Sequence, residues 1–171
     1  LIYDHRYVYR EIGYNLKPIE IQGALGLEQM KKLGDMEAAR RLNYKSLFNI
    51  FEKHKDYFYI SEELKLADTC WFCFLVTVKE NAPFVKQDLI NHLENNKIQT
   101  RPYFAGNLLY HPAYKDLKAK YNNICEEFSV SKIATTNSFF LGTFIGIDKE
   151  DMKKIGNVVN NFMIMRGCSN V

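Results

Sequence analysis

The sequence has 171 residues, of which 47% are hydrophobic and 25% are charged, and its formal net charge is +3. This length and balance are ordinary for a globular domain with a real core, although two small lobes also fit. The modest charge argues against a nucleic acid or a membrane surface as partner. No apolar run approaches the ~20 residues that a membrane-spanning helix needs. Because the chain begins at Leu1 without a methionine or signal peptide, we expect a piece of a longer protein.

A turn and a helix start follow the amino-terminal segment. Gly13 and Asn15 favour a turn, and Pro18 suits the first position of a helix. Glu20 places a carboxylate in the first helical turn, where the helix dipole favours negative charge. The Asn15 amide and the first N–H groups of the helix are suited to an anion. On spacing alone, an ordinary turn asparagine is the simpler interpretation.

Apolar residues then recur at helical spacing from Pro18 to His54, interrupted only near Gly34. This pattern predicts a long helix that is bent or broken at that point and can join two lobes. Its first turns carry little side-chain bulk, which permits another backbone, a subunit or a ligand to approach closely. The small residues concerned are Gly23, Ala24 and Gly26.

The rest of the chain alternates between strand and helix patterns. We expect strands at residues 57–60, 70–79 and 98–104, extended chain at 135–147, and polar connections at 62–69 and 125–128. Helices are expected at residues 85–95 and 113–121, with a helical turn at 129–134. Asp148 and Asp151 mark the start of a closing helix that ends at Arg166 and Gly167. The order predicts an α/β chain of the α+β type, with a small sheet covered by helices on one face.

The four cysteines do not form a metal-site pattern. Cys70 and Cys73 make the single CxxC, but it falls in a strand pattern, where residues three apart point to opposite faces. With Cys125 and Cys168 they are expected to be buried free thiols in a reducing cytoplasm.

Side chains suited to a phosphorylated or sugar-like ligand gather at the end of the third expected strand. Arg101 offers a guanidinium fork for phosphate, and Asn107 offers an amide for hydroxyl groups. His111, beside a proline in a loop, is interpreted as a surface residue and not a base. Trp71 and Phe72 can stack on a ligand ring, although aromatic strand residues more often belong to the core.

The residues alone predict no catalytic centre. Lys17, Lys79 and Lys86 fall on polar faces, so no lysine lies in an apolar setting that would suggest covalent catalysis. The sequence also contains no catalytic triad, P-loop or dinucleotide fingerprint.

Several motifs resemble the DegT/DnrJ/StrS family of sugar aminotransferases and dehydratases. The first are DHRYVY at residues 4–9 and GYNLKPIEIQGALG at residues 13–26. Three more are similar to the nucleotide-diphosphate 4-keto-6-deoxyhexose 3-dehydratases: WFCF at 71–74, TRPYFAGN at 100–107 and NSFFLG at 137–142. Ordinary aminotransferases of the family tend to carry a histidine-containing sequence in place of the second of these.

The resemblance implies fold type I of the enzymes that use pyridoxal phosphate (PLP) or pyridoxamine phosphate (PMP). Residues 1–35 would end the large cofactor-binding domain and begin the linking helix, and residues 36–171 would form the small carboxy-terminal domain. The implied reaction removes the C3 hydroxyl from a nucleotide-linked 4-keto-6-deoxyhexose, in deoxysugar or lipopolysaccharide O-antigen biosynthesis. A lysine forms the Schiff base in the aminotransferases, and a histidine replaces it in the dehydratases. This residue would lie upstream of Leu1, as would the ligands of the iron–sulfur cluster found in one dehydratase group. No catalytic or metal residue is therefore expected here, and the chain alone should be inactive.

The resemblance also assigns roles to residues of this chain. Asn15 matches the asparagine that reaches the partner subunit's cofactor phosphate in a homodimer with shared active sites. Arg101 and Asn107 match the substrate-side loop, and Phe72 is a weaker match to a sugar-facing position. A reductase is a further implied partner for one type of dehydratase. Two alternatives stay open: a nucleotide-sugar aminotransferase, and a non-catalytic module that binds a sugar or a partner.

Overall fold

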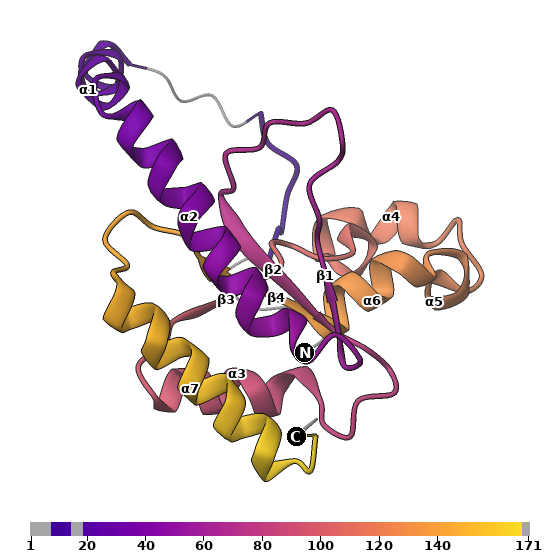
Figure 1. The fold of residues 1–171 in the computed structure, drawn as a ribbon. Coiled ribbons are helices and arrows are strands. Elements are labelled where there is room, and N and C mark those ends of the chain that lie inside the picture. Colours follow the sequence, from indigo (N-terminus) through magenta and orange to yellow (C-terminus); the bar gives the residue numbers. More distant parts are fainter. Residues whose placement is uncertain (1–7, 15–18, 169–171) are drawn as a thin grey trace.

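The computed structural model describes residues 8–14 and 19–168 (Figure 1). Its longer helices are α1 (Glu20–Met30), α2 (Leu33–Glu52), α3 (Lys86–Asn95), α6 (Ser129–Asn137) and α7 (Lys149–Met165). Shorter helical pieces are η2 (Leu108–Tyr110), η3 (Pro112–Tyr114), α4 (Lys115–Lys118) and α5 (Ile124–Glu127). The strands are β1 (Phe58–Ile60), β2 (Cys73–Val78), β3 (Thr100–Pro102) and β4 (Ser138–Gly142).

The four strands form one antiparallel sheet in the order β1-β2-β4-β3. Side chains alternate along β2, so that Phe74, Val76 and Val78 are buried while the intervening residues are partly exposed. The buried side faces α2, α3 and α7, which lie together against the sheet (Figure 1). This arrangement confirms the expected small sheet with helices packed on one face.

Aromatic and aliphatic side chains from α2, the sheet and α7 fill the space between the two layers. Phe51 of α2 lies at the centre, with its ring 5.2 Å from that of Phe58 and 5.4 Å from that of Phe74. Val159 and Met163 of α7 are fully buried against the same cluster. Each such side chain contributes about 1.5–3 kcal/mol relative to leaving it in water, so this layer supplies most of the stability.

The closing helix α7 begins and ends where local signals place it. The Asp148 carboxylate accepts a hydrogen bond from the Asp151 amide at 2.9 Å, and the Asp151 carboxylate accepts one from the Asp148 amide at 3.3 Å. At the other end Gly167 has φ +68°, and the Cys168 amide donates back to the Met163 carbonyl at 2.9 Å. This is the glycine-terminated arrangement expected from the sequence.

The long amino-terminal helix is broken, as expected, but the break lies at Lys31 and Lys32, and Gly34 sits inside α2. α1 stands apart from the body of the molecule and buries none of its side chains (Figure 1). A Cβ added at Gly23 or Gly26 would meet nothing within 4 Å in the described structure. None of the described residues therefore packs closely against these glycines.

The segment between β3 and β4 contains more helix than the sequence patterns predicted. Residues 125–128, expected as a connector, mostly belong to α5, and residues 135–137, expected as extended chain, complete α6. The Lys86 ammonium donates to the carbonyls of Thr135 and Ser138, at 2.9 and 3.4 Å, and so satisfies the end of α6. Lys86 is therefore half-buried and not on a polar face, and this burial lowers its pKa.

All four cysteines are free thiols, but the expectation that all are buried is wrong. Cys168 is buried, Cys70 and Cys73 are half-buried, and Cys125 is exposed. The strand begins only at Cys73, which leaves Cys70 outside the sheet.

Within the described residues no cluster of three or more histidine, cysteine or acidic side chains could hold a metal ion. None of the described helices is long and apolar enough to cross a membrane.

Candidate substrate-facing site

The face of the sheet opposite α2, α3 and α7 carries Arg101. Strand register places Arg101 of β3 directly opposite Phe140 of β4, and Phe140 opposite Leu75 of β2. Directly opposed residues project to the same side, which here is the side away from the buried face of β2. In the described part of the chain no carboxylate or hydrogen-bond acceptor pairs with the Arg101 guanidinium. Its charged fork is therefore available to an anion.

Three phenylalanines, Phe72, Phe104 and Phe140, form what we call the outer aromatic cluster. The ring of Phe140 lies 6.0 Å from that of Phe72 and 5.6 Å from that of Phe104, and the last two are 6.3 Å apart. Phe72 is 60% exposed and Phe104 49% exposed, so two π faces are open to solvent. The guanidinium carbon of Arg40, on α2, lies 6.0 Å from the centre of the Phe72 ring.

Trp71 and Phe72 are adjacent in the sequence, but Trp71 packs against the core and Phe72 is exposed. Trp71 stacks on Tyr44 with ring centres 3.8 Å apart and packs against the core. Phe72 points to the outer face. Sequence reasoning left open whether either residue meets a ligand, and the structure leaves Phe72 as the accessible one.

Residues 103–107 form a strained turn between β3 and η2. Phe104 has φ +46° and Gly106 has φ +64°, both in the left-handed region. A Cβ at Gly106 would lie 2.7 Å from the Thr135 hydroxyl oxygen, so only glycine allows the turn to press against α6. The same hydroxyl oxygen accepts a hydrogen bond from the backbone N–H of Asn107 at 2.8 Å. Non-glycine residues in this conformation are enriched at ligand sites because the surrounding structure must hold them there.

Asn107 is 7% exposed, and its side chain starts η2 by accepting a hydrogen bond from the Leu109 amide at 3.0 Å. Its side-chain nitrogen is buried and has no hydrogen-bond partner in the described part of the chain. Such an atom normally costs about 1–3 kcal/mol, so an external acceptor would be favoured. The predicted ligand contact thus has a second, structural task that spacing did not reveal.

His111 is buried, which contradicts its interpretation as a surface residue. It is 1% exposed, and its Nε2 lies 2.8 Å from the Ala105 carbonyl oxygen. Its Nδ1 accepts a hydrogen bond from the Tyr9 amide at 3.3 Å. The two helical turns η2 and η3 fold this histidine inward, and no local pattern distinguishes that outcome from an exposed loop.

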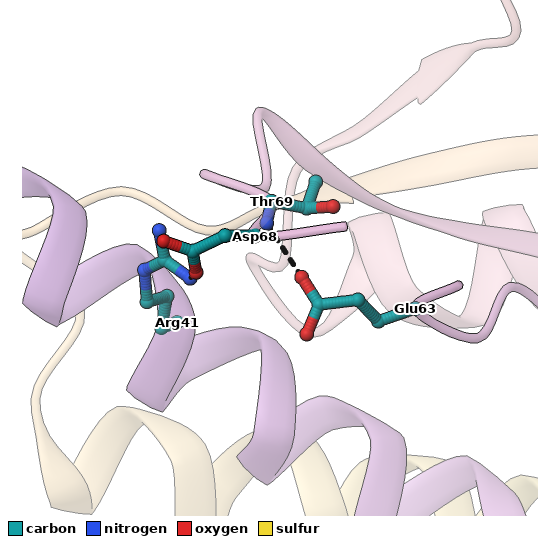
Figure 2. A network of polar contacts seen from close by, with 4 residues as sticks. All are labelled: Arg41, Glu63, Asp68 and Thr69. Carbon is teal, nitrogen blue, oxygen red and sulfur yellow. Dashed lines mark hydrogen bonds and ion pairs between the residues drawn. The ribbon is translucent and has the colours of Figure 1, made fainter. Parts of the chain in front are cut away.

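Polar contacts hold the connection before β2 in place beside α2 (Figure 2). Arg41 forms an ion pair with Asp68, and this hydrogen bond raises the Arg41 pKa above its ordinary value. The Glu63 carboxylate accepts a hydrogen bond from the Thr69 amide at 2.5 Å. Arg41 is thereby engaged, whereas its neighbour Arg40 lies over Phe72. Sequence reasoning missed Arg40, because only the fold brings it to the outer aromatic cluster.

Asn15, the predicted cofactor contact, lies outside the described residues.

The model of the DegT/DnrJ/EryC1/StrS aminotransferase family matches residues 2–160. Since this match covers most of the chain, the protein belongs to that family. The fold is that of the fold type I enzymes that use PLP.

Two curated relatives match nearly all of the chain. It is 30% identical over 161 residues to a dTDP-4-dehydro-2,6-dideoxy-D-glucose 3-dehydratase of Saccharopolyspora spinosa, covering 94% of this chain and 34% of that protein. It is 29% identical to the lipopolysaccharide biosynthesis protein RfbH of Salmonella typhimurium, with 94% and 36% covered. The chain thus spans about a third of the length of the curated relatives that it matches.

Solved structures agree with this relationship. An E. coli GDP-4-keto-6-deoxy-D-mannose-3-dehydratase with bound hydrated PLP is 26% identical, with a TM-score of 0.68 over 85% of this chain and 36% of that one. An aminotransferase from Psychrobacter cryohalolentis has a TM-score of 0.77 over 96% of this chain and 44% of that one. At 17% identity, the second supports the fold alone.

Proposed function

We propose that the chain is the carboxy-terminal part of a nucleotide-sugar 3-dehydratase that uses PLP or PMP. The reaction would remove the C3 hydroxyl from a nucleotide-diphosphate 4-keto-6-deoxyhexose, in deoxysugar or lipopolysaccharide O-antigen biosynthesis. The observation that carries the proposal is the Arg101 guanidinium, which pairs with none of the described residues and projects to the same side as Phe140 of the outer aromatic cluster. The names of the 3-dehydratase relatives support it.

The described side chains suit such a substrate. The Arg101 fork would bind diphosphate oxygens in two parallel hydrogen bonds. The exposed faces of Phe72 and Phe104 would contact the sugar or the base. The buried amide nitrogen of Asn107 would donate to a ligand oxygen. These donors fit the hydroxyl and phosphate oxygens that both the substrate and the cofactor present.

The cofactor supplies the amine and the electron sink for loss of the hydroxyl group. In this proposal residues 1–35 end the large domain that holds most of it, and residues 36–171 form the small domain. Asn15 would reach the cofactor phosphate of the partner subunit, so the active enzyme would be a homodimer with shared sites. An iron–sulfur cluster, as in one dehydratase group, would be bound upstream of Leu1 and served by a reductase. The four free cysteines support a cytoplasmic location.

The test is product analysis with the full-length enzyme and a nucleotide-linked 4-keto-6-deoxyhexose. One arm supplies L-glutamate: the sugar loses its C3 oxygen, glutamate is oxidised to 2-oxoglutarate, and ammonia leaves. A second arm supplies PMP with an NADH-dependent reductase, in which NADH provides the two electrons and the oxygen leaves as water. We expect a 4-keto-3,6-dideoxy product in at least one arm, detected by mass spectrometry.

Two outcomes contradict the dehydratase proposal. A product that keeps the C3 hydroxyl and gains an amine at C4 would instead identify a nucleotide-sugar aminotransferase. Binding of the nucleotide sugar without any chemical change in either arm would identify a non-catalytic module.

A further inference from the structure

His111 joins two segments that are far apart in the sequence. Its Nε2 lies 2.8 Å from the Ala105 carbonyl oxygen, inside the strained turn 103–107. Its Nδ1 lies 3.3 Å from the amide nitrogen of Tyr9, which is 102 positions away. The Tyr9 ring also packs on the imidazole with ring centres 5.3 Å apart, and the Ala113 amide donates to the Tyr9 carbonyl at 3.0 Å.

These contacts define the tautomer of the imidazole. A backbone amide can only donate, so Nδ1 of His111 must accept from Tyr9 and must carry no proton. The proton therefore sits on Nε2, which donates it to the Ala105 carbonyl. Both ring nitrogens thus contact backbone groups, and the side chain is 1% exposed.

The contact to Ala105 bears directly on the candidate site. Ala105 follows Phe104, whose positive φ must be held by its surroundings. On one side the turn is held by Thr135, whose hydroxyl oxygen accepts from the Asn107 amide. On the other side it is held by His111. Phe104 and Asn107, two of the proposed substrate contacts, thus depend on these two supports.

We propose that His111 is a positioning residue that fixes the turn 103–107 relative to the amino-terminal segment containing Tyr9. The proposal rests on the proposed function for the identity of the ligands. The turn carries proposed contacts to the nucleotide sugar, whereas Tyr9 belongs to a segment 102 positions away in the sequence. One imidazole would in this way hold the two segments together, with a different nitrogen serving each side.

The two nitrogens can be tested separately in the full-length enzyme. Gln places its amide nitrogen near the Nε2 position, so His111→Gln keeps a donor for Ala105 and removes the acceptor for Tyr9. Asn places its amide oxygen near the Nδ1 position, so His111→Asn keeps the acceptor for Tyr9 and removes the donor for Ala105. His92→Gln is the matched control, because the His92 ring also contacts a backbone carbonyl, that of Val158, at 3.2 Å.

We expect a crossed pattern of effects. His111→Asn should raise the KM for the nucleotide sugar about five- to tenfold. His111→Gln should change this KM less, because it keeps the donor for Ala105. Hydrogen exchange supplies a readout independent of ligands: exchange at the Tyr9 amide should accelerate in His111→Gln and not in His111→Asn. His92→Gln should change the melting temperature alone.

Equal effects of both variants on KM and on exchange would overturn the proposal, because they would indicate a general structural role. Unchanged values in both folded variants would overturn it as well. A wild-type enzyme that binds no nucleotide sugar would instead refute the proposed function. The exchange pattern at Tyr9 would still decide whether His111 holds the two segments.

Discussion

At the scale of single residues, the candidate site depends on which side of the sheet a side chain faces. Arg101 projects from β3 to the face opposite α2, α3 and α7, whereas its neighbour Thr100 is buried and donates to Glu94 at 2.6 Å. A guanidinium on the helix-covered side would need a buried partner, which is costly to arrange. On the opposite side Arg101 is only half-buried, so water can reach it until a ligand replaces that water.

Replacement of Arg101 should therefore weaken substrate binding without affecting folding. We expect Arg101→Gln to raise the KM for the nucleotide sugar about 10- to 100-fold, since a charge-assisted hydrogen bond contributes about 1.5–3 kcal/mol. The KM of Arg101→Lys should lie between those of the wild type and Arg101→Gln, because lysine keeps the charge and loses the planar fork. Steady-state kinetics and melting temperatures check both points. The control is Arg41→Gln, which removes only an exposed ion pair and should leave KM unchanged.

Gly106 and Gly167 provide a matched pair for the strained turn. Both have positive φ, +64° and +68°, but a Cβ at Gly106 would meet Thr135, whereas a Cβ at Gly167 would meet none of the described residues within 4 Å. Gly167→Ala should cost about 1–2 kcal/mol for the backbone conformation. Gly106→Ala should cost at least about 1 kcal/mol more, because Thr135 must move. Urea unfolding measures both losses, and equal losses would show that Thr135 yields without cost.

At the scale of helices and strands, local signals were sufficient where a boundary is set by neighbours in the sequence. The caps at Asp148 and Gly167 place α7, and the alternation of apolar residues places β2. The outer aromatic cluster could not be predicted in this way. Phe140 meets Phe104 and Phe72 only because β4 lies between β2 and β3 in one particular register. The role of His111 is hidden for the same reason, since its partner Tyr9 is remote in the chain.

Tyr44 links α2 to the connection after β1 and should make stability depend on alkaline pH. Its hydroxyl donates to the Ser61 carbonyl, and burial is the main cause that raises its pKa to about 12. The unfolded value is about 10. Because the folded state keeps this proton longer, the stabilisation is complete below pH ~10 and is lost as the pH rises towards about 12.

The measurement for Tyr44 is the difference in unfolding free energy between the wild type and Tyr44→Phe. Urea titrations from about pH 8 upward should show this difference shrinking above pH ~10. Other ionising groups cancel in the subtraction. A difference that stays constant with pH would show that the tyrosine titrates alike in both states.

At the scale of the whole molecule, α1 has too few contacts to be stable by itself. It has 11 residues and buries none of them, and helices of this length are marginal in water. In the 171-residue chain alone, we expect its amides to exchange with solvent far faster than those of α2 around the buried Leu47 and Phe51. In the full-length protein α1 should be protected, because the rest of the protein would cover its exposed apolar side chains.

Hydrogen–deuterium exchange with mass spectrometry compares the two forms directly, and α2 serves as the internal reference. Fast exchange of α1 in both forms would mean that the remainder of the protein does not cover it. Slow exchange in the isolated chain would mean that α1 is stabilised by association between copies.

The pairing of β3 with β4 separates the turn 103–107 and its supports from the rest of the sheet. Pro102 and Phe139 are directly paired, so residues 103–137 leave the sheet and return to it at adjacent positions. The strained turn, Asn107, His111 and Thr135 all belong to this excursion, which Figure 1 shows to one side of the layer formed by α2, α3 and α7. Because its two ends are adjacent in the sheet, this segment can be replaced by another without moving β3 or β4. Grafting the equivalent segment of a related enzyme between the same two strands should transfer sugar preference while the underlying framework is retained.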